Sequence, residues 1–166
     1  MDAARFHEKV GDLLSKTKTF AGRPSWETER GGAVYRVRVQ LIIDGTVRID
    51  VALTANALTH ISPQPMTLQL IVDDRPIERI ESLAAPHSNR FDKRVPARLR
   101  GMHLPLGSNQ LHPWEANHAW PASDNLPVAE LASFDTDPAS VIRFGLERWR
   151  IDSDLPPPPH EPRLDL

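Results

Sequence analysis

Apolar residues at the start of the chain recur every three or four positions, as they do on the buried face of a helix. Between residues 2 and 16 these positions are Phe6, Val10, Leu13 and Leu14. Asp2 stands where an N-cap would accept a hydrogen bond from the first turn. The pattern predicts an amphipathic helix over residues 2–16, with a narrow apolar stripe that packs on a sheet.

From residue 33 the period changes to two, which is typical of strands with one buried face. Three stretches alternate in this way: residues 33–43, 46–54 and 66–72. Asp44 and Gly45, between the first two, favour a hairpin turn. A two-residue turn would put the two apolar faces in conflict, so we expect an odd-length loop or a β-bulge. Residues 77–83 fit either a short helix or an edge strand.

The second half opens with a long segment, residues 86–127, that has no sustained period and contains six prolines. Forty residues without structure would be unusual in a compact domain unless the segment is functional or holds short strands. We expect short strands near residues 98–106 and 110–114.

The end of the chain predicts one more helix and a tail. Asp137 followed by Pro138 is typical of a helix start and predicts a helix over residues 139–151. Residues 152–166 contain four consecutive prolines and predict a flexible tail. The whole pattern predicts a single α+β domain over residues 1–151. Its parts are an N-terminal helix, an antiparallel meander of three to four strands, a long His/Pro-rich irregular segment and a C-terminal helix.

Composition limits the kind of protein. With 166 residues, 40% hydrophobic and 25% charged, the chain has the size and balance of one globular domain. It has no cysteine, which excludes disulfides, thiol nucleophiles and Cys-ligated zinc. The N-terminus lacks the apolar core of a signal peptide, and no run approaches the ~18 apolar residues of a membrane span. We therefore expect a cytoplasmic protein without a membrane partner.

The side chains that could act in catalysis or binding are concentrated in residues 86–120. This stretch holds four of the seven histidines and two of the four tryptophans. A metal-independent ribonuclease needs a general acid, a general base and a cation for the phosphate. His103 and His112 are the candidate acid and base, with Arg98 or Arg100 as the cation. The candidate binding residues for RNA around them are His87, Arg90, Lys93, Arg94, Trp114, His118 and Trp120.

The net charge of the chain and the spacing of its histidines both bear on the ribonuclease hypothesis. The formal charge of −2 gives no general attraction to nucleic acid, although residues 90–100 carry five basic residues against one acidic residue. The histidine spacings match no ligand motif, so no metal and no cofactor are expected.

A second hypothesis needs no catalysis. The histidines can hydrogen-bond to the loop backbone, the tryptophans can fill the core, and the basic run can be a solvated surface. The protein would then be a non-enzymatic interaction module that docks a protein partner through the same segment and the Pro-rich tail. The two hypotheses differ in one geometric respect: a catalytic site requires the imidazoles to converge.

Two family resemblances bear on function. Through His87, His103, His112, Trp114 and Trp120 and the region 126–151, the chain resembles small uncharacterised bacterial and phage proteins of toxin–antitoxin or mobile-element loci. That resemblance implies a role in defence or growth control. His112-Pro113-Trp114 is also similar to the His-Pro-Asn turn of ubiquitin-conjugating (E2-like) enzymes. Trp replaces Asn, and the catalytic cysteine is absent, so this likeness implies a non-catalytic binding variant.

Overall fold

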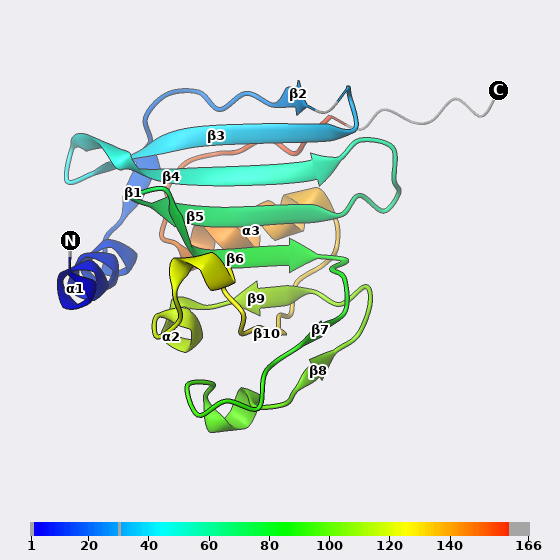
Figure 1. The fold of residues 1–166 in the computed structure, drawn as a ribbon. Coiled ribbons are helices and arrows are strands. Elements are labelled where there is room, and N and C mark those ends of the chain that lie inside the picture. The colour runs from blue at the N-terminus through cyan, green and yellow to red at the C-terminus, as the bar shows by residue number, and fades with distance from the viewer. Residues whose placement is uncertain (1, 30, 160–166) are drawn as a thin grey trace.

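The computed structural model describes residues 2–29 and 31–159, which form an α+β fold around one large antiparallel sheet (Figure 1). The strand order is β1-β3-β4-β5-β6-β9-β10, with β2 paired to β3. The helices are α1 (Ala3–Ser15), α2 (Trp114–Asn117) and α3 (Pro138–Arg148). The sheet strands are β1 (Lys18–Phe20), β2 (Glu27–Glu29), β3 (Val34–Ile43), β4 (Thr46–Leu58), β5 (Met66–Val72), β6 (Arg75–Ser82), β9 (Gln110–His112) and β10 (Glu130–Leu131). A separate pair is formed by β7 (His87–Ser88) and β8 (His103–Leu104).

The turn between β3 and β4 shows how the conflict between their apolar faces is resolved. Asp44 and Gly45 form a two-residue turn with positive φ at both positions, so that Ile43 pairs with Thr46. The register then shifts between Gln40 and Leu41, and residues 49–51 of β4 have no partner on β3. The structure therefore uses a bulge, one of the two solutions that the alternation allowed. The bulge places Val51 and Leu53 in the core, but it leaves Val47 and Ile49 exposed, at 52% and 86%.

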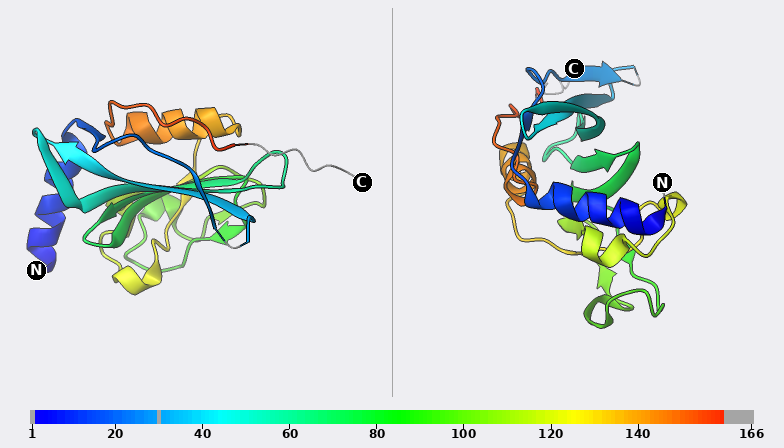
Figure 2. Two further views of the ribbon diagram at one scale, coloured as in Figure 1. Left: turned by 90° about the horizontal axis from the view of Figure 1, so that it is seen from above. Right: turned by 90° about the vertical axis from the view of Figure 1, so that its left-hand side faces the viewer.

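Helix α3 covers one face of the sheet, as Figure 2 shows edge-on. Gly145 lets the helix approach closely, since a Cβ there would lie 2.9 Å from Cδ2 of Leu68. Trp149, just after the helix, is fully buried in the main core. The helix begins at Pro138, one residue before the predicted range 139–151, and ends at Arg148, three residues before the end of that range. The Asp137 side chain accepts from the backbone N–H of Ser140.

Helix α1 lies at the end of the sheet that carries the β3–β4 and β5–β6 turns. Lys9 bridges Asp50 in the bulge of β4 and Asp73 in the β5–β6 turn, at 2.7 Å each. Lys16 binds Asp44 in the β3–β4 turn at 2.9 Å. Asp2 caps the helix by accepting from the backbone N–H of Arg5.

The remaining segments differ in detail from the sequence prediction. Residues 77–83 fitted either a short helix or an edge strand, and all but the last of them belong to β6, which lies inside the sheet between β5 and β9. The segment expected to be irregular contains β7, β8, β9, α2 and two short 3-10 helices, Ala97–Leu99 and Ala122–Asp124. In the described ranges no helix is long and apolar enough to cross a membrane.

The Pro-rich tail was predicted to be flexible from residue 152, but its described part, residues 152–159, packs on the domain. Leu155 is buried, and the indole N–H of Trp26 donates to the carbonyl of Pro156 at 2.8 Å. Asp152 extends this attachment by donating its backbone N–H to Lys18. The rest of the predicted tail, residues 160–166, lies outside the described residues.

Candidate functional site

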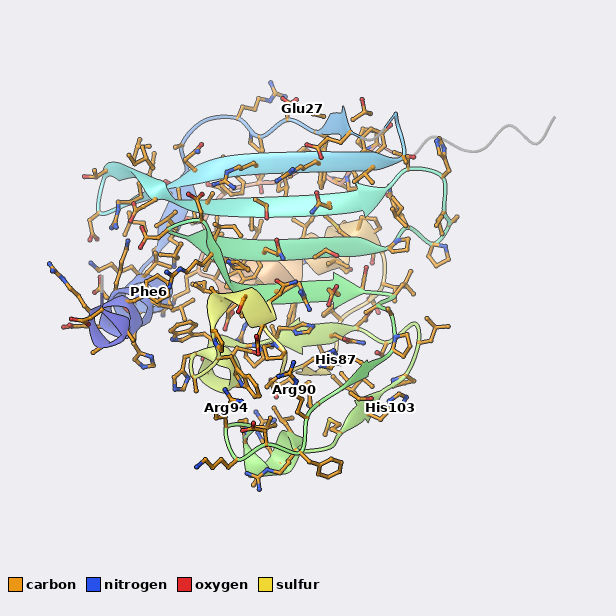
Figure 3. All side chains as sticks on the ribbon, viewed as in Figure 1. Phe6, Glu27, His87, Arg90, Arg94 and His103 are labelled. Atoms are coloured by element: carbon orange, nitrogen blue, oxygen red, sulfur yellow. The ribbon has the colours of Figure 1, made fainter. Side chains whose placement is uncertain are left out.

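Residues 87–104 form a hairpin that projects from the edge of the molecule beside β9 and β10 (Figure 1). Its base is held by Asn89, a buried side chain that donates to the carbonyls of Leu99 and Ala129 and accepts from the N–H of Ala129. A small second core stabilises it, formed by Val95, Leu99, Ala116, Trp120 and Val128. The hairpin is therefore an ordered element with its own packing, and it carries most of the candidate residues (Figure 3).

His112, the candidate acid or base on β9, is completely buried, at 0% exposure. Its Nδ1 lies 2.7 Å from the carbonyl of Leu126, and its Nε2 lies 3.1 Å from Arg79 and 3.0 Å from Glu81. In the neutral ring, Nδ1–H donates to Leu126 and Nε2 accepts from the guanidinium. Burial lowers the pKa of His112, and the charge of Arg79 acts in the same direction. The ring has no open side from which a substrate could reach it.

The other candidate histidines lie in separate places. The ring of His87 packs against that of His112 with centroids 5.3 Å apart, and its Nε2 lies 3.0 Å from the carbonyl of Pro127. His103 is exposed on β8, where its Nδ1 lies 2.9 Å from Oγ of its cross-strand neighbour Ser88. His118 follows α2 and meets His7 of α1, with centroids 4.7 Å apart. The structure thus brings only His87 and His112 of the four into ring contact.

The arginines of the basic run are largely occupied within the protein. Arg98 lies 2.6 Å from Glu130, Arg94 lies 2.8 Å from Asp92, and Arg90 lies 3.3 Å from Asp124. The neighbouring Arg94 lowers the pKa of the Asp92 carboxyl. Arg100 donates to the backbone carbonyls of Asp92 and Val95. Lys93 is exposed. These pairings reduce the positive potential that the sequence suggested for phosphate.

The two candidate tryptophans pack against other side chains of the protein. Trp120 is 8% exposed, and the guanidinium of Arg94 lies 3.8 Å from its ring centroid, with that of Arg90 at 5.2 Å. Trp114, at the start of α2, makes an edge contact with Phe6 of α1 at 5.9 Å. Because Trp120 is covered by protein, it leaves little ring surface for a nucleic-acid base.

Two features were missed by sequence reasoning. Phe91 on the hairpin is 88% exposed, and its only sequence signal is an aromatic residue inside a basic run. The second feature is a cavity of about 780 Å³ between α1 and α2, called here the aromatic cavity. Its principal lining residues are Phe6, His7, Arg75, Trp114, His118 and Trp120. They come from three separate segments, residues 6–7, 75 and 114–120, and no local pattern could have joined them.

Among the described residues, no group of three or more histidine, aspartate or glutamate side chains is placed to hold a metal ion. No family model, curated protein or solved structure matches this chain. The function must therefore be argued from the geometry alone.

Proposed function

We propose that this protein is a non-enzymatic interaction module that docks a protein partner through the hairpin 87–104. The observation that carries the proposal is the placement of Phe91. Its ring is 88% exposed although the hairpin around it is packed and hydrogen-bonded. Large aromatic side chains are the residues that most often anchor protein interfaces.

The Phe91 ring lies against Gly101. A Cβ at Gly101 would lie 2.2 Å from Cζ of Phe91, so the ring rests directly on the glycine backbone. Gly101 also has φ +68°, a conformation that L side chains rarely adopt. The hairpin therefore has a glycine where its backbone conformation and the approach of the aromatic ring both require one.

The base of the hairpin supports a preorganised docking element. Asn89 ties it to Leu99 and Ala129, and Arg94 stacks on Trp120. A surface that is ordered before binding loses less conformational entropy when the partner arrives. Lys93 is an exposed cation on the same hairpin, and Arg98 stays exposed beside its partner Glu130. The partner chemistry that fits is an apolar pocket for the Phe91 ring, bordered by carboxylates.

The ribonuclease hypothesis has less support. It needs His103 and His112 at one substrate, yet His112 is at 0% exposure while His103 faces solvent beside Ser88. A general acid must come within hydrogen-bond reach of the group that it protonates. The resemblance of His112-Pro113-Trp114 to the E2-like turn would likewise imply a non-catalytic binding protein.

The experiment that tests the proposal places a photo-crosslinking benzoylphenylalanine at position 91 in cells of the native host. The control places it at Ile49, which is 86% exposed in the bulge of β4. We expect one discrete adduct from position 91 and none of the same mass from position 49. We also expect Gly101→Ala, combined with the probe at 91, to reduce that adduct because the new Cβ displaces the ring.

Two results would contradict the proposal. One is the same adduct pattern from both positions, which would mean that any exposed apolar side chain is captured. The other is the absence of any adduct from position 91 in cells that produce the protein at its normal level. Single His→Ala changes at His103 or His118 should leave the adduct intact.

A further inference from the structure

The aromatic cavity has the size and lining of a small-molecule site and is separate from the docking surface of the hairpin. Its volume of about 780 Å³ lies within the range of ligand pockets, and its lining includes Phe6, Trp114 and Trp120. The rings of Phe6 and Trp114 already pack edge to face at 5.9 Å, which fixes one aromatic wall between α1 and α2.

One donor in the cavity lining has no acceptor. Trp120 lines the cavity and is 8% exposed, and its indole Nε1 is buried without a hydrogen-bond partner among the described residues. Buried N–H groups in native proteins nearly always find an acceptor, because leaving one unpaired is unfavourable. A ligand that supplies an oxygen to this N–H would remove the penalty.

The charged groups of the lining also favour a ligand that supplies oxygen acceptors. Arg75 forms no ion pair within the described part of the chain, and its guanidinium lies over the ring of Phe6 at 5.3 Å. The two acidic lining residues are engaged elsewhere. Asp73 binds Lys9 at 2.7 Å, and Asp2 accepts from the N–H of Arg5 at 2.8 Å. The cavity thus has an unpaired cation and an unpaired N–H donor, while its carboxylates are satisfied.

From these observations we propose that the aromatic cavity binds a small aromatic carboxylate. The ring of the ligand would pack against Phe6 and Trp114, and its oxygens would be the acceptors that Arg75 and the Trp120 N–H lack. A cationic ligand fits less well, because it would face the guanidinium of Arg75 and leave the indole N–H unsatisfied.

The test measures binding of 2-naphthoate to the full chain by titration calorimetry, with 2-naphthylmethanol as the uncharged control. We expect saturable one-to-one binding of naphthoate. Arg75→Gln removes the cation from an exposed position and should weaken naphthoate on the order of tenfold, with less than about a twofold change for naphthylmethanol. Arg143→Gln on α3, far from this lining, is the matched control and should change neither.

Trp120→Phe provides a second variant, which keeps an aromatic ring and removes the N–H. It should weaken naphthoate as well, and its melting temperature should be measured because Trp120 belongs to the small core of the hairpin. If this variant unfolds, Arg75→Gln still decides the question. Phe91→Ser should leave naphthoate binding unchanged, so that failure here is distinct from failure of the docking proposal.

Three results would overturn the inference. The first is no saturable binding of naphthoate at about 5 mM. The second is equal affinity for naphthoate and naphthylmethanol, or tighter binding of a naphthyl trimethylammonium cation. The third is tighter binding of a tetrapeptide ending in phenylalanine than of naphthoate. That result would assign the cavity to the C-terminal carboxylate of a peptide instead of a small molecule.

Discussion

The guanidinium of Arg148 on α3 binds the carboxylate of Glu78 on β6 through two hydrogen bonds of 2.7 Å, and Glu78 is only 1% exposed. The same carboxylate accepts from the indole N–H of Trp149 at 2.7 Å and from the backbone N–H of Trp114 at 2.9 Å. One buried acid therefore connects the helix on the back of the sheet with the start of α2. These four hydrogen bonds satisfy the oxygens of the carboxyl group inside the fold.

Glu78→Gln should strongly destabilise the protein. The change removes the negative charge that faces the partly buried Arg148, and breaking a buried pair from one side costs about 3–5 kcal/mol. The free energy of unfolding from urea titration measures the effect. Glu115→Gln is the matched control, since Glu115 is 71% exposed and lies 3.5 Å from the same guanidinium. It should cost less than about 1 kcal/mol. Equal losses in the two variants would contradict this role of Glu78.

Lys18 should make the protein more stable at alkaline pH. Its ammonium group is buried at 1% exposure and donates to the carbonyls of Lys16 and Trp149, and burial lowers its pKa from 10.5 to about 8. The unfolded chain holds this proton up to pH 10.5, so the penalty for burying the charge is full below pH 8. It disappears as the pH rises from 8 to 10.5. At about 1.4 kcal/mol per pKa unit, the free energy of unfolding should rise by about 3 kcal/mol across this range.

The check for Lys18 is urea unfolding at pH 8 and pH 10. Lys18→Met should abolish the rise over this range, because methionine has no proton to lose. A parent protein whose stability is flat or falling between these pH values would show that Lys18 keeps its ordinary pKa.

His112 should make the protein less stable in mild acid. Burial lowers its pKa below the ordinary value of 6.5, so the unfolded state binds a proton more readily than the folded state does. The stability that the neutral ring contributes is fully present above pH 6.5 and is lost as the pH falls through the folded-state pKa. Unfolding free energies at pH 7.5 and pH 5.5 measure the loss. His103→Ala should retain this dependence and His112→Gln should reduce it.

We expect no ribonuclease activity. Purified protein incubated with total RNA in excess EDTA should cleave no more than a His103→Ala/His112→Gln double variant. The reason is that His112 is enclosed by Glu81, Arg79 and Leu126 and cannot exchange a proton with a substrate. Cleavage by the parent that disappears in His103→Ala, with an unchanged melting temperature, would revive the catalytic hypothesis.

The sequence indicated a stretch to consider for a site but not how its residues are paired. Residues 86–120 were chosen for their content of histidine, arginine and proline, and they include the projecting hairpin 87–104. The partners of those residues could not be anticipated. Arg98 meets Glu130, and His112 meets Glu81, across 32 and 31 positions of the chain. Contacts of this kind depend on which strands become neighbours.

The sequence by itself determined the elements whose cause is local. Helical periodicity with a capping aspartate defined α1 and α3, and strict alternation defined β3, β4 and β5, because side-chain direction repeats with the backbone geometry of each element. Only the tertiary structure decided which polar side chains were buried. The insertion of β9 beside β6 placed His112 against Arg79, and the meeting of α1 with α2 created the aromatic cavity. Those outcomes arise from packing between segments far apart in the chain, and hydrophobic periodicity carries no information about such neighbours.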